Sequence, residues 1–308
     1  MTTLLDATEL RRRLESGGRT VVVDVRWTLG DPNGHAHYLE AHLPGAVYAD
    51  LSTELADHAE PGRGRHPLPS KQKFQESARR WGLHDGDTVV AYDDSGNMAA
   101  ARLWWMLRDA GVGSVYLLDG GLAAWRAAGY PVEAGEVVPA VGSITLGEGH
   151  MPVITEEETA AWPQHGTLLD ARAGERYRGD VEPVDPRAGH IPGAVSAPTT
   201  ENLSAGGRFL DPGQLRRRFA GLGLDPAGQV AVYCGSGVTA SHEIAALEIA
   251  GYRAALFPGS FSQWSTNAAN AVDTGDRPYA AGAPGDGTVP TGTRPTGTRA
   301  VPGSSVRA

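Results

Sequence analysis

A single cysteine, Cys234, stands where a short apolar run meets a glycine-containing loop. The run at 229–233 is typical of a buried strand, and the residues at 240–250 are typical of a helix. In an open α/β sheet, ligands bind beyond the carboxyl ends of the strands, where this cysteine would lie. The loop glycines allow successive backbone N–H groups to point at the sulfur, and a helix N-terminus adds partial positive charge. This pattern favours a nucleophilic thiolate over a buried structural cysteine.

The absence of a second cysteine in the sequence limits the chemistry of Cys234. It excludes a disulfide framework and any cysteine-based zinc or iron–sulfur site within one chain. We therefore expect no metal and no cofactor. The loop residues expected to contact a bound anion are Gly235, Ser236, Gly237, Val238 and Thr239.

The segment around Cys234 has a counterpart in the first half of the chain, because the sequence repeats itself. Four short segments recur in the same order, and they align Asp24 with Asp170, His42 with His190, Tyr92 with Tyr233 and Trp125 with Trp264. Collinear matches of this kind indicate a duplicated domain. In each copy, apolar runs alternate with helical patterns, which predicts two α/β domains, each a mainly parallel sheet flanked by helices.

The two copies differ at the position where the chemistry is expected. Asp93 stands in the first copy where Cys234 stands in the second, and a carboxylate cannot act as a sulfur nucleophile. We therefore expect a non-catalytic first domain that supplies one wall of a cleft. The expected divisions are a first domain at 1–132, a linker at 133–152, a catalytic domain at 153–280 and a disordered tail at 281–308, rich in glycine, proline and threonine.

The amino-acid composition excludes some classes of binding partner. The net charge of −9 argues against a nucleic-acid-binding surface, which needs clustered cations. No apolar run approaches the length of a membrane span, and the first residues lack a secretory pattern, so we expect a cytoplasmic protein. Lys71 and Lys73 are the only lysines, which leaves arginine to bind an anionic substrate.

The tandem repeat, the two His-(Leu/Ile)-Pro-Gly-Ala segments and the loop Cys-Gly-Ser-Gly-Val-Thr-Ala resemble the two-domain rhodaneses, or sulfurtransferases. The resemblance runs from Leu4 to about Tyr279, and the loop is similar to that of the 3-mercaptopyruvate sulfurtransferases. It implies that Cys234 takes sulfur from this small anionic donor, releases pyruvate and holds the sulfur as a persulfide. With no second cysteine, the acceptor must be external: cyanide, a thioredoxin-like protein or a low-molecular-weight thiol.

The same resemblance assigns roles to other residues. Arg176 matches the arginine that holds the substrate carboxylate, and Arg187 is expected to act as a second clamp, although the residues before it depart from the family's pattern. Ser236, His66 and Asp50 match a proton relay. In that relay the imidazole takes the proton of the substrate thiol through the serine, and the aspartate fixes its tautomer.

Four alternatives are compared with this prediction. A cysteine phosphatase needs an arginine six residues after the nucleophile, where this chain has Ala240, and nothing specifically suggests a cysteine protease. A non-enzymatic binding module remains an alternative, because the first copy lacks the cysteine. Thiosulfate as the sulfur donor also remains an alternative. Rhodaneses that use it usually carry cationic residues after the cysteine, where this chain has Gly235 and Ser236.

Overall fold

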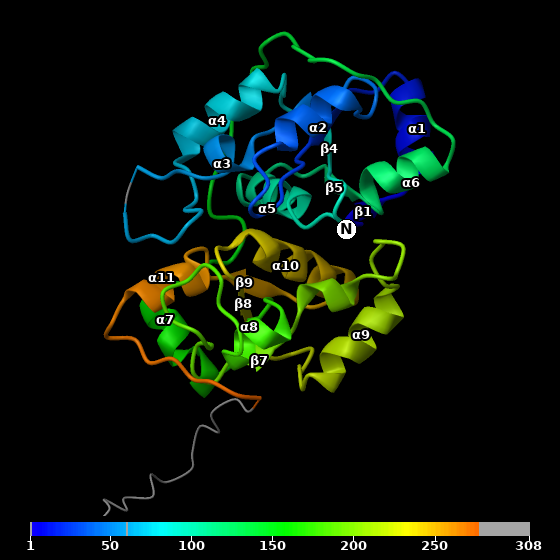
Figure 1. The fold of residues 1–308 in the computed structure, drawn as a ribbon. Helices are drawn as coiled ribbons and strands as arrows, with labels where there is room; N and C mark the ends of the chain where they lie inside the picture. Colours follow the sequence, from blue (N-terminus) through cyan, green and yellow to red (C-terminus); the bar gives the residue numbers. More distant parts are fainter. Residues whose placement is uncertain (1, 60, 277–308) are drawn as a thin grey trace, which may run out of the picture.

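The computed structural model describes residues 2–59 and 61–276, which form two α/β halves that face each other (Figure 1). The tail predicted at 281–308 lies outside the described residues. Within the described part of the chain, none of the helices has the length and apolar character needed to cross a membrane.

The first half contains a five-stranded sheet with the order β1-β5-β4-β2-β3, in which every neighbouring pair is parallel. Its central strands are runs of valine and other apolar residues buried on both faces, as parallel sheets require. The strands are β1 (Leu4–Leu5), β2 (Thr20–Asp24), β3 (Val47–Tyr48), β4 (Thr88–Tyr92) and β5 (Val115–Leu118). The helices are α1 (Ala7–Glu15), α2 (Gly34–Glu40), α3 (Leu51–Glu54), α4 (Lys71–Arg80), α5 (Ala100–Asp109) and α6 (Gly121–Ala127).

The second half repeats this arrangement with a four-stranded parallel sheet of order β7-β6-β8-β9. The predicted fold class is therefore confirmed, because both sheets are parallel and both are flanked by helices. The strands are β6 (Thr167–Asp170), β7 (Val195–Ser196), β8 (Val230–Tyr233) and β9 (Ala254–Leu256). The helices are α7 (Glu156–Ala161), α8 (Gly174–Arg178), α9 (Pro212–Gly221), α10 (Val238–Ala250) and α11 (Ser260–Thr266), with short 3-10 turns η1 (Trp162–Gln164) and η2 (Thr199–Asn202).

Each half fixes the end of an inner strand, β2 or β6, with the same buried ion pair. Asp24 binds Arg26 at 2.7 Å, and the repeated pair of Asp170 and Arg172 has a distance of 2.6 Å. Each arginine also donates a 2.6 Å hydrogen bond to the carbonyl just before the repeated histidine. The ion pair therefore holds the loop that follows the strand, which explains why it recurs in both copies.

Two equivalent helices, α5 and α10, pack against each other between the halves (Figure 1). Buried residues occur all round α10, since it also packs against the sheet of its own half. The connection between the halves, at 134–152, contains no helix or strand. It runs along the first half, where Ile144 and Leu146 join the core. This packing brings the loops before α5 and α10 to the same interface.

Candidate active site

Cys234 lies directly after β8, at the start of the loop that leads into α10. Its side chain is buried, with 2% of the residue exposed, and the backbone N–H of Gly237 donates to Sγ at 3.1 Å. Gly237 has a φ of +80°, and a Cβ there would collide with the carbonyl oxygen of Pro258. Glycine is therefore required for the turn that points this amide at the sulfur.

The equivalent loop of the first half holds a carboxylate in place of the thiol. Asp93 is fully buried, and its two oxygens accept four backbone N–H bonds of 2.7–3.1 Å, two on each oxygen. Burial raises the pKa of Asp93, and the four hydrogen bonds oppose that shift. The loop of this repeat is thus built to hold an anionic side chain through backbone amides.

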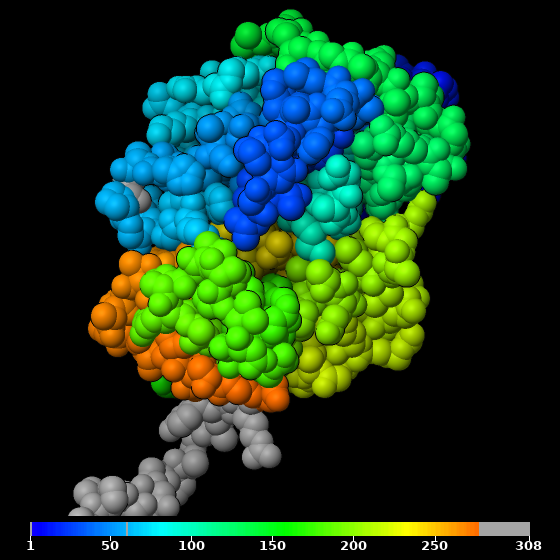
Figure 2. All heavy atoms as spheres, in the orientation of Figure 1, coloured from blue at the N-terminus to red at the C-terminus, as the bar shows by residue number. Residues whose placement is uncertain are grey.

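A cavity of about 310 Å³ opens onto Cys234 between the two halves. In Figure 2, gold-coloured chain is seen recessed between the blue first half and the green segment of the second half. The cavity is lined by Trp27, Leu29, Arg65 and Met98 of the first half and by Ala171, Arg172, Ala173, Arg176, Thr199, Thr200, Cys234, Gly235, Ser236, Val238 and Thr239 of the second. The loop residues predicted to contact the substrate line this cavity, except Gly237.

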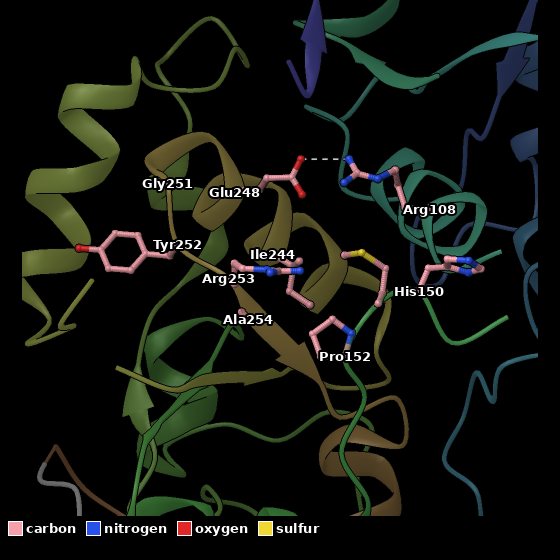
Figure 3. Close-up of a pocket in the computed structure, with 10 residues that line it drawn as sticks. Arg108, His150, Pro152, Ile244, Glu248, Gly251, Tyr252, Arg253 and Ala254 are labelled. Carbon is pink, nitrogen blue, oxygen red and sulfur yellow. Dashed lines mark hydrogen bonds and ion pairs between the residues drawn. The ribbon is translucent and has the colours of Figure 1, made fainter. Parts of the chain in front are cut away.

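A larger cavity, of about 360 Å³, lies near the carboxyl end of α10 (Figure 3). Arg108 and Glu248 bind each other there at 3.0 Å. Its lining residues include no nucleophilic cysteine, so we place the chemistry at the smaller cavity.

Arg176 lies at the cavity as the resemblance implied. It projects from α8, and its Nη2 binds Glu182 at 2.7 Å and Asp185 at 3.0 Å. A Cβ placed on Gly235 would lie 3.3 Å from Nη1 of Arg176. The guanidinium therefore faces the residue that follows the cysteine.

Arg65 was not predicted, yet it faces the same place from the first half. Its Nη1 binds Asp185, and its Nη2 would lie 2.9 Å from a Cβ on Gly235. Its backbone N–H donates to Ser262 Oγ at 3.0 Å, which fixes this loop on the second half. Among the residues that the structure describes, neither Arg65 Nη2 nor Arg176 Nη1 has a hydrogen-bond partner. The two arginines therefore supply the positive charge that the loop itself lacks.

Burial and neighbouring charges shift the pKa values of Asp185 and Glu182, the carboxylates that bind these arginines. Burial raises the pKa of Asp185, against the opposing charge of Arg65. Burial acts in the same direction on Glu182, but the hydrogen bond from Arg176 and nearby backbone amides hold the pKa of Glu182 below its usual value.

The structure does not bring Arg187 to the position expected of a second clamp. Its guanidinium donates four hydrogen bonds of 2.7–3.1 Å to the carbonyls of Trp264, Ser265, Asn267 and Asn270. All four carbonyls lie at or just beyond the end of α11, where helical C=O groups lack intrahelical partners. Arg187 therefore stabilises this helix end, and it does not line the cavity at Cys234.

His66 and Ser236 meet across the interface of the halves. His66 Nδ1 lies 2.8 Å from Ser236 Oγ, and both residues are buried. The rings of His66 and Trp27 also form a T-shaped contact, with ring centroids 5.2 Å apart. Burial lowers the pKa of His66 to about 4, and the charges of Arg102 and Arg65 act in the same direction. The imidazole is therefore neutral at neutral pH and free to accept a proton.

Asp50 does not join this pair. Its Oδ1 accepts the backbone N–H groups of Ser52 and Thr53 at 2.8 and 3.1 Å, as the N-cap of α3. No hydrogen bond connects Asp50 to His66 within the described part of the chain. The predicted three-residue relay is thus reduced to a pair, because Asp50 satisfies the start of a helix.

Comparison with known proteins shows the same duplication and fold. The family model described as "Rhodanese-like domain" matches residues 6–128 and 155–267. A Mycobacterium tuberculosis protein provisionally named as thiosulfate sulfurtransferase SseB is 47% identical over 277 residues, or 88% of this chain and 97% of that protein. A Pseudomonas aeruginosa protein provisionally named as a 3-mercaptopyruvate sulfurtransferase is 45% identical over 281 residues, or 89% of this chain and 98% of that protein. The crystal structure of SseA from Escherichia coli, described with the 3-mercaptopyruvate sulfotransferases, has a TM-score of 0.76 at 30% identity and covers 85% of this chain and 100% of its own.

Proposed function

Because the chain belongs to the rhodanese-like family and is a sulfurtransferase, we propose that it moves sulfur from 3-mercaptopyruvate through a persulfide on Cys234 to an external acceptor. The observation that carries the choice of donor is the contact between neutral His66 and Ser236 beside the nucleophile. The non-enzymatic binding module is set aside, since the similar proteins are named as sulfurtransferases.

The first half-reaction forms one S–S bond and breaks one C–S bond. The Cys234 thiolate attacks the sulfur of 3-mercaptopyruvate, and the electron pair of the C–S bond leaves on carbon as the enolate of pyruvate. The thiol proton of the donor must leave the sulfur, and the enolate carbon must gain a proton. The balanced products are a Cys234 persulfide anion and pyruvate, with one proton moved from sulfur to carbon.

The pair of His66 and Ser236 is suited to that proton transfer. A histidine whose pKa is lowered to about 4 is unprotonated at neutral pH, so it accepts the thiol proton through the serine hydroxyl and returns it to the enolate. The corresponding step with thiosulfate moves no proton, because sulfite leaves with its charge already in place. A buried proton acceptor beside Cys234 therefore favours a thiol donor.

The two arginines give a place for the keto-acid carboxylate. Arg65 Nη2 and Arg176 Nη1 face Gly235 and are unoccupied by protein acceptors among residues 2–59 and 61–276. Two guanidinium groups that converge on one point suit a carboxylate, which accepts a hydrogen bond from each. Asp185 binds both arginines from the other side and keeps them oriented.

The backbone N–H groups of the Cys234 loop are suited to hold the negative charge of a persulfide. The carboxylate oxygens of Asp93 lie two bonds beyond Cβ, as the outer sulfur of a persulfide on Cys234 does. Four backbone amides hold those oxygens in the first half. The repeat therefore supports a persulfide held by the amides of the Cys234 loop and the start of α10.

The second half-reaction needs an acceptor from outside. The chain has no second cysteine, so the persulfide cannot be released as an intramolecular disulfide. Attack on the outer sulfur by cyanide, by a low-molecular-weight thiol or by a thioredoxin-like protein regenerates Cys234.

Thiosulfate is the second candidate donor, and the same two arginines favour it. Rhodaneses that use thiosulfate usually carry cations directly after the cysteine, and here Arg65 and Arg176 bring positive charge to Gly235 from other elements. The donors differ in their need for His66, because only 3-mercaptopyruvate has a proton to transfer.

The test measures steady-state sulfur transfer to cyanide with each donor at matched concentration, in wild type and in His66→Gln. We expect the higher kcat/KM with 3-mercaptopyruvate and a loss of tenfold or more in His66→Gln for that donor alone. Exposure to 3-mercaptopyruvate should add the mass of one sulfur atom to the Cys234 peptide, and Cys234→Ser should abolish both turnover and adduct. A higher kcat/KM with thiosulfate overturns the donor, and turnover by Cys234→Ser overturns the persulfide.

A further inference from the structure

One buried cation near the nucleophile has no anionic partner. Arg102 projects from α5 of the first half and is 0% exposed. Its guanidinium donates to backbone carbonyls only: to His66 at 2.9 Å, to Gly237 at 3.2 Å, and to Leu55 at 3.3 and 3.4 Å. Within the described residues it forms no ion pair. Burial lowers the pKa of Arg102 to about 10, so it still carries its charge at neutral pH.

The equivalent contact in the other direction, from α10 to the loop of the first half, is made by an uncharged side chain. Gly96 is the counterpart of Gly237 in the repeat, and its carbonyl lies 3.1 Å from His242 Nε2 of α10. Burial lowers the pKa of His242 to about 3, so this side chain carries no charge at neutral pH. Each half therefore contacts the loop glycine of the other, but a cation is placed only on the side that holds Cys234. On the side that holds Asp93, whose carboxylate oxygens already accept four backbone N–H groups, the facing group is neutral.

Burying a guanidinium without a carboxylate is unfavourable, so its retention needs a compensating negative charge nearby. Cys234 supplies one in its reactive forms. Its charge raises the pKa of Arg102 against the effect of burial, which means that the two groups stabilise each other's charged forms. The other arginines at the cavity already have carboxylates: Arg172 binds Asp170, while Arg65 and Arg176 share Asp185.

We propose that Arg102 is a positioning residue for sulfur transfer, whose buried charge stabilises the thiolate and persulfide of Cys234 from inside the domain interface. The inference rests on the proposed persulfide chemistry. Arg102 acts through the loop that it touches: its bond to the Gly237 carbonyl holds the residue whose N–H group donates to Sγ. The same guanidinium also donates a hydrogen bond to the backbone carbonyl of His66, and so holds the residue that is the proposed proton acceptor.

The test compares Arg102→Gln, Arg102→Lys and the control Arg108→Gln. Arg108 lies on the same helix and across the same interface, but it is paired with Glu248 (Figure 3). The measurement is the ultraviolet absorbance of the thiolate as a function of pH, taken as the difference from the same titration of a matched Cys234→Ser variant, which subtracts the absorbance of the nine tyrosines. The groups that face it in all variants are Arg65, Arg172, Arg176 and His66, and none of these is changed.

We expect Arg102→Gln to move the midpoint of thiolate formation upward by about one pH unit or more, which is tenfold less thiolate at lower pH. Arg102→Lys should restore the midpoint to within about half a unit of wild type, and Arg108→Gln should not move it. A folded Arg102→Gln variant with lower thermal stability and an unchanged midpoint means a merely structural role and overturns the proposal.

Arg102→Lys carries the test if Arg102→Gln does not fold. A midpoint raised by a full unit in the folded lysine variant would then refute the role of the charge. The proposed function is tested separately by the persulfide mass on wild-type Cys234. Formation of the thiolate as expected, without a sulfur adduct from 3-mercaptopyruvate, would overturn the proposed function and support the role of Arg102.

Discussion

Replacing Arg65 by glutamine tests how the substrate carboxylate is held. The substitution removes the guanidinium that faces Gly235 and leaves Arg176 as the one remaining cation at that position. Asp185 keeps its 3.0 Å bond to Arg176, so the second arginine stays oriented. The change therefore removes one arm of the proposed carboxylate clamp while the other stays in place.

The size of the effect follows from the contacts of Arg65. A hydrogen bond to a charged group contributes about 1.5–3 kcal/mol, and each 1.4 kcal/mol corresponds to about tenfold in affinity. Arg65 is already paired with Asp185 and its side chain is 26% exposed, so substrate binding adds to an existing partially solvated interaction. We therefore expect the lower limit, a rise of about tenfold in KM for 3-mercaptopyruvate. Because the carboxylate is remote from the C–S bond that breaks, kcat should change by less than about threefold.

The assay is steady-state pyruvate release over a range of 3-mercaptopyruvate concentrations. Arg176→Gln should raise KM by a similar factor, and the double variant should show coupling, since both side chains bind Asp185. The control is Arg178→Gln, on the same helix as Arg176 but exposed and paired with Asp180. Unchanged KM in a folded Arg65→Gln variant would refute the clamp, as would an equal rise in Arg178→Gln.

Three further predictions concern residues whose place the structure decides. Since the pKa of His66 is lowered to about 4, the neutral form persists as pH falls, so kcat/KM for 3-mercaptopyruvate should show no loss centred near pH 6.5; such a loss, absent from His66→Gln, would contradict the neutral imidazole. Arg187→Met should lower the free energy of unfolding by about 2–4 kcal/mol in denaturant titrations, through four lost bonds to carbonyls, while KM stays within about twofold. Asp50→Ala should lower stability by about 1 kcal/mol as a lost helix cap, and a selective loss of 3-mercaptopyruvate turnover would instead restore Asp50 to the relay.

The fold and the position of Cys234 in it were predictable because their signals are local or repeated. The strand, loop and helix around Cys234 are contiguous, and the duplication is visible as collinear segments. Arg65 carries no such signal. It acts at Gly235 through a contact between the halves, and its partner Asp185 is 120 residues away in sequence. Side-chain partners across a domain interface are set by packing, which a single sequence does not display.

Asp50 and Arg187 lie away from their expected positions for different physical reasons. Asp50 followed by Leu-Ser-Thr-Glu is an N-cap pattern, and that local signal explains its position better than a role in a relay. Arg187 was assigned by likeness to a family position although the residues before it depart from that pattern. The chain there turns the side chain to the end of α11, and Arg65 brings the second guanidinium from the other half.

Because Asp93 replaces the cysteine in the first copy, the two halves have different roles in the proposed mechanism. The first half lacks a nucleophile, but in the proposed mechanism it supplies His66, Arg65 and Arg102 to the cysteine of the second. The carboxylate oxygens of Asp93 accept four amides of their own loop, and the facing side chain of α10 is neutral. In the proposed mechanism the negative charge at Cys234 moves during turnover, from the thiolate sulfur to the outer sulfur of the persulfide and back. A site of that kind gains from a fixed cation held on a separate element, because the cation stays in place while the charge moves between the two sulfurs. The duplicated fold supplies that element, which is α5. In the first half this helix follows the loop of Asp93, and it places Arg102 against the loop of Cys234 in the second half.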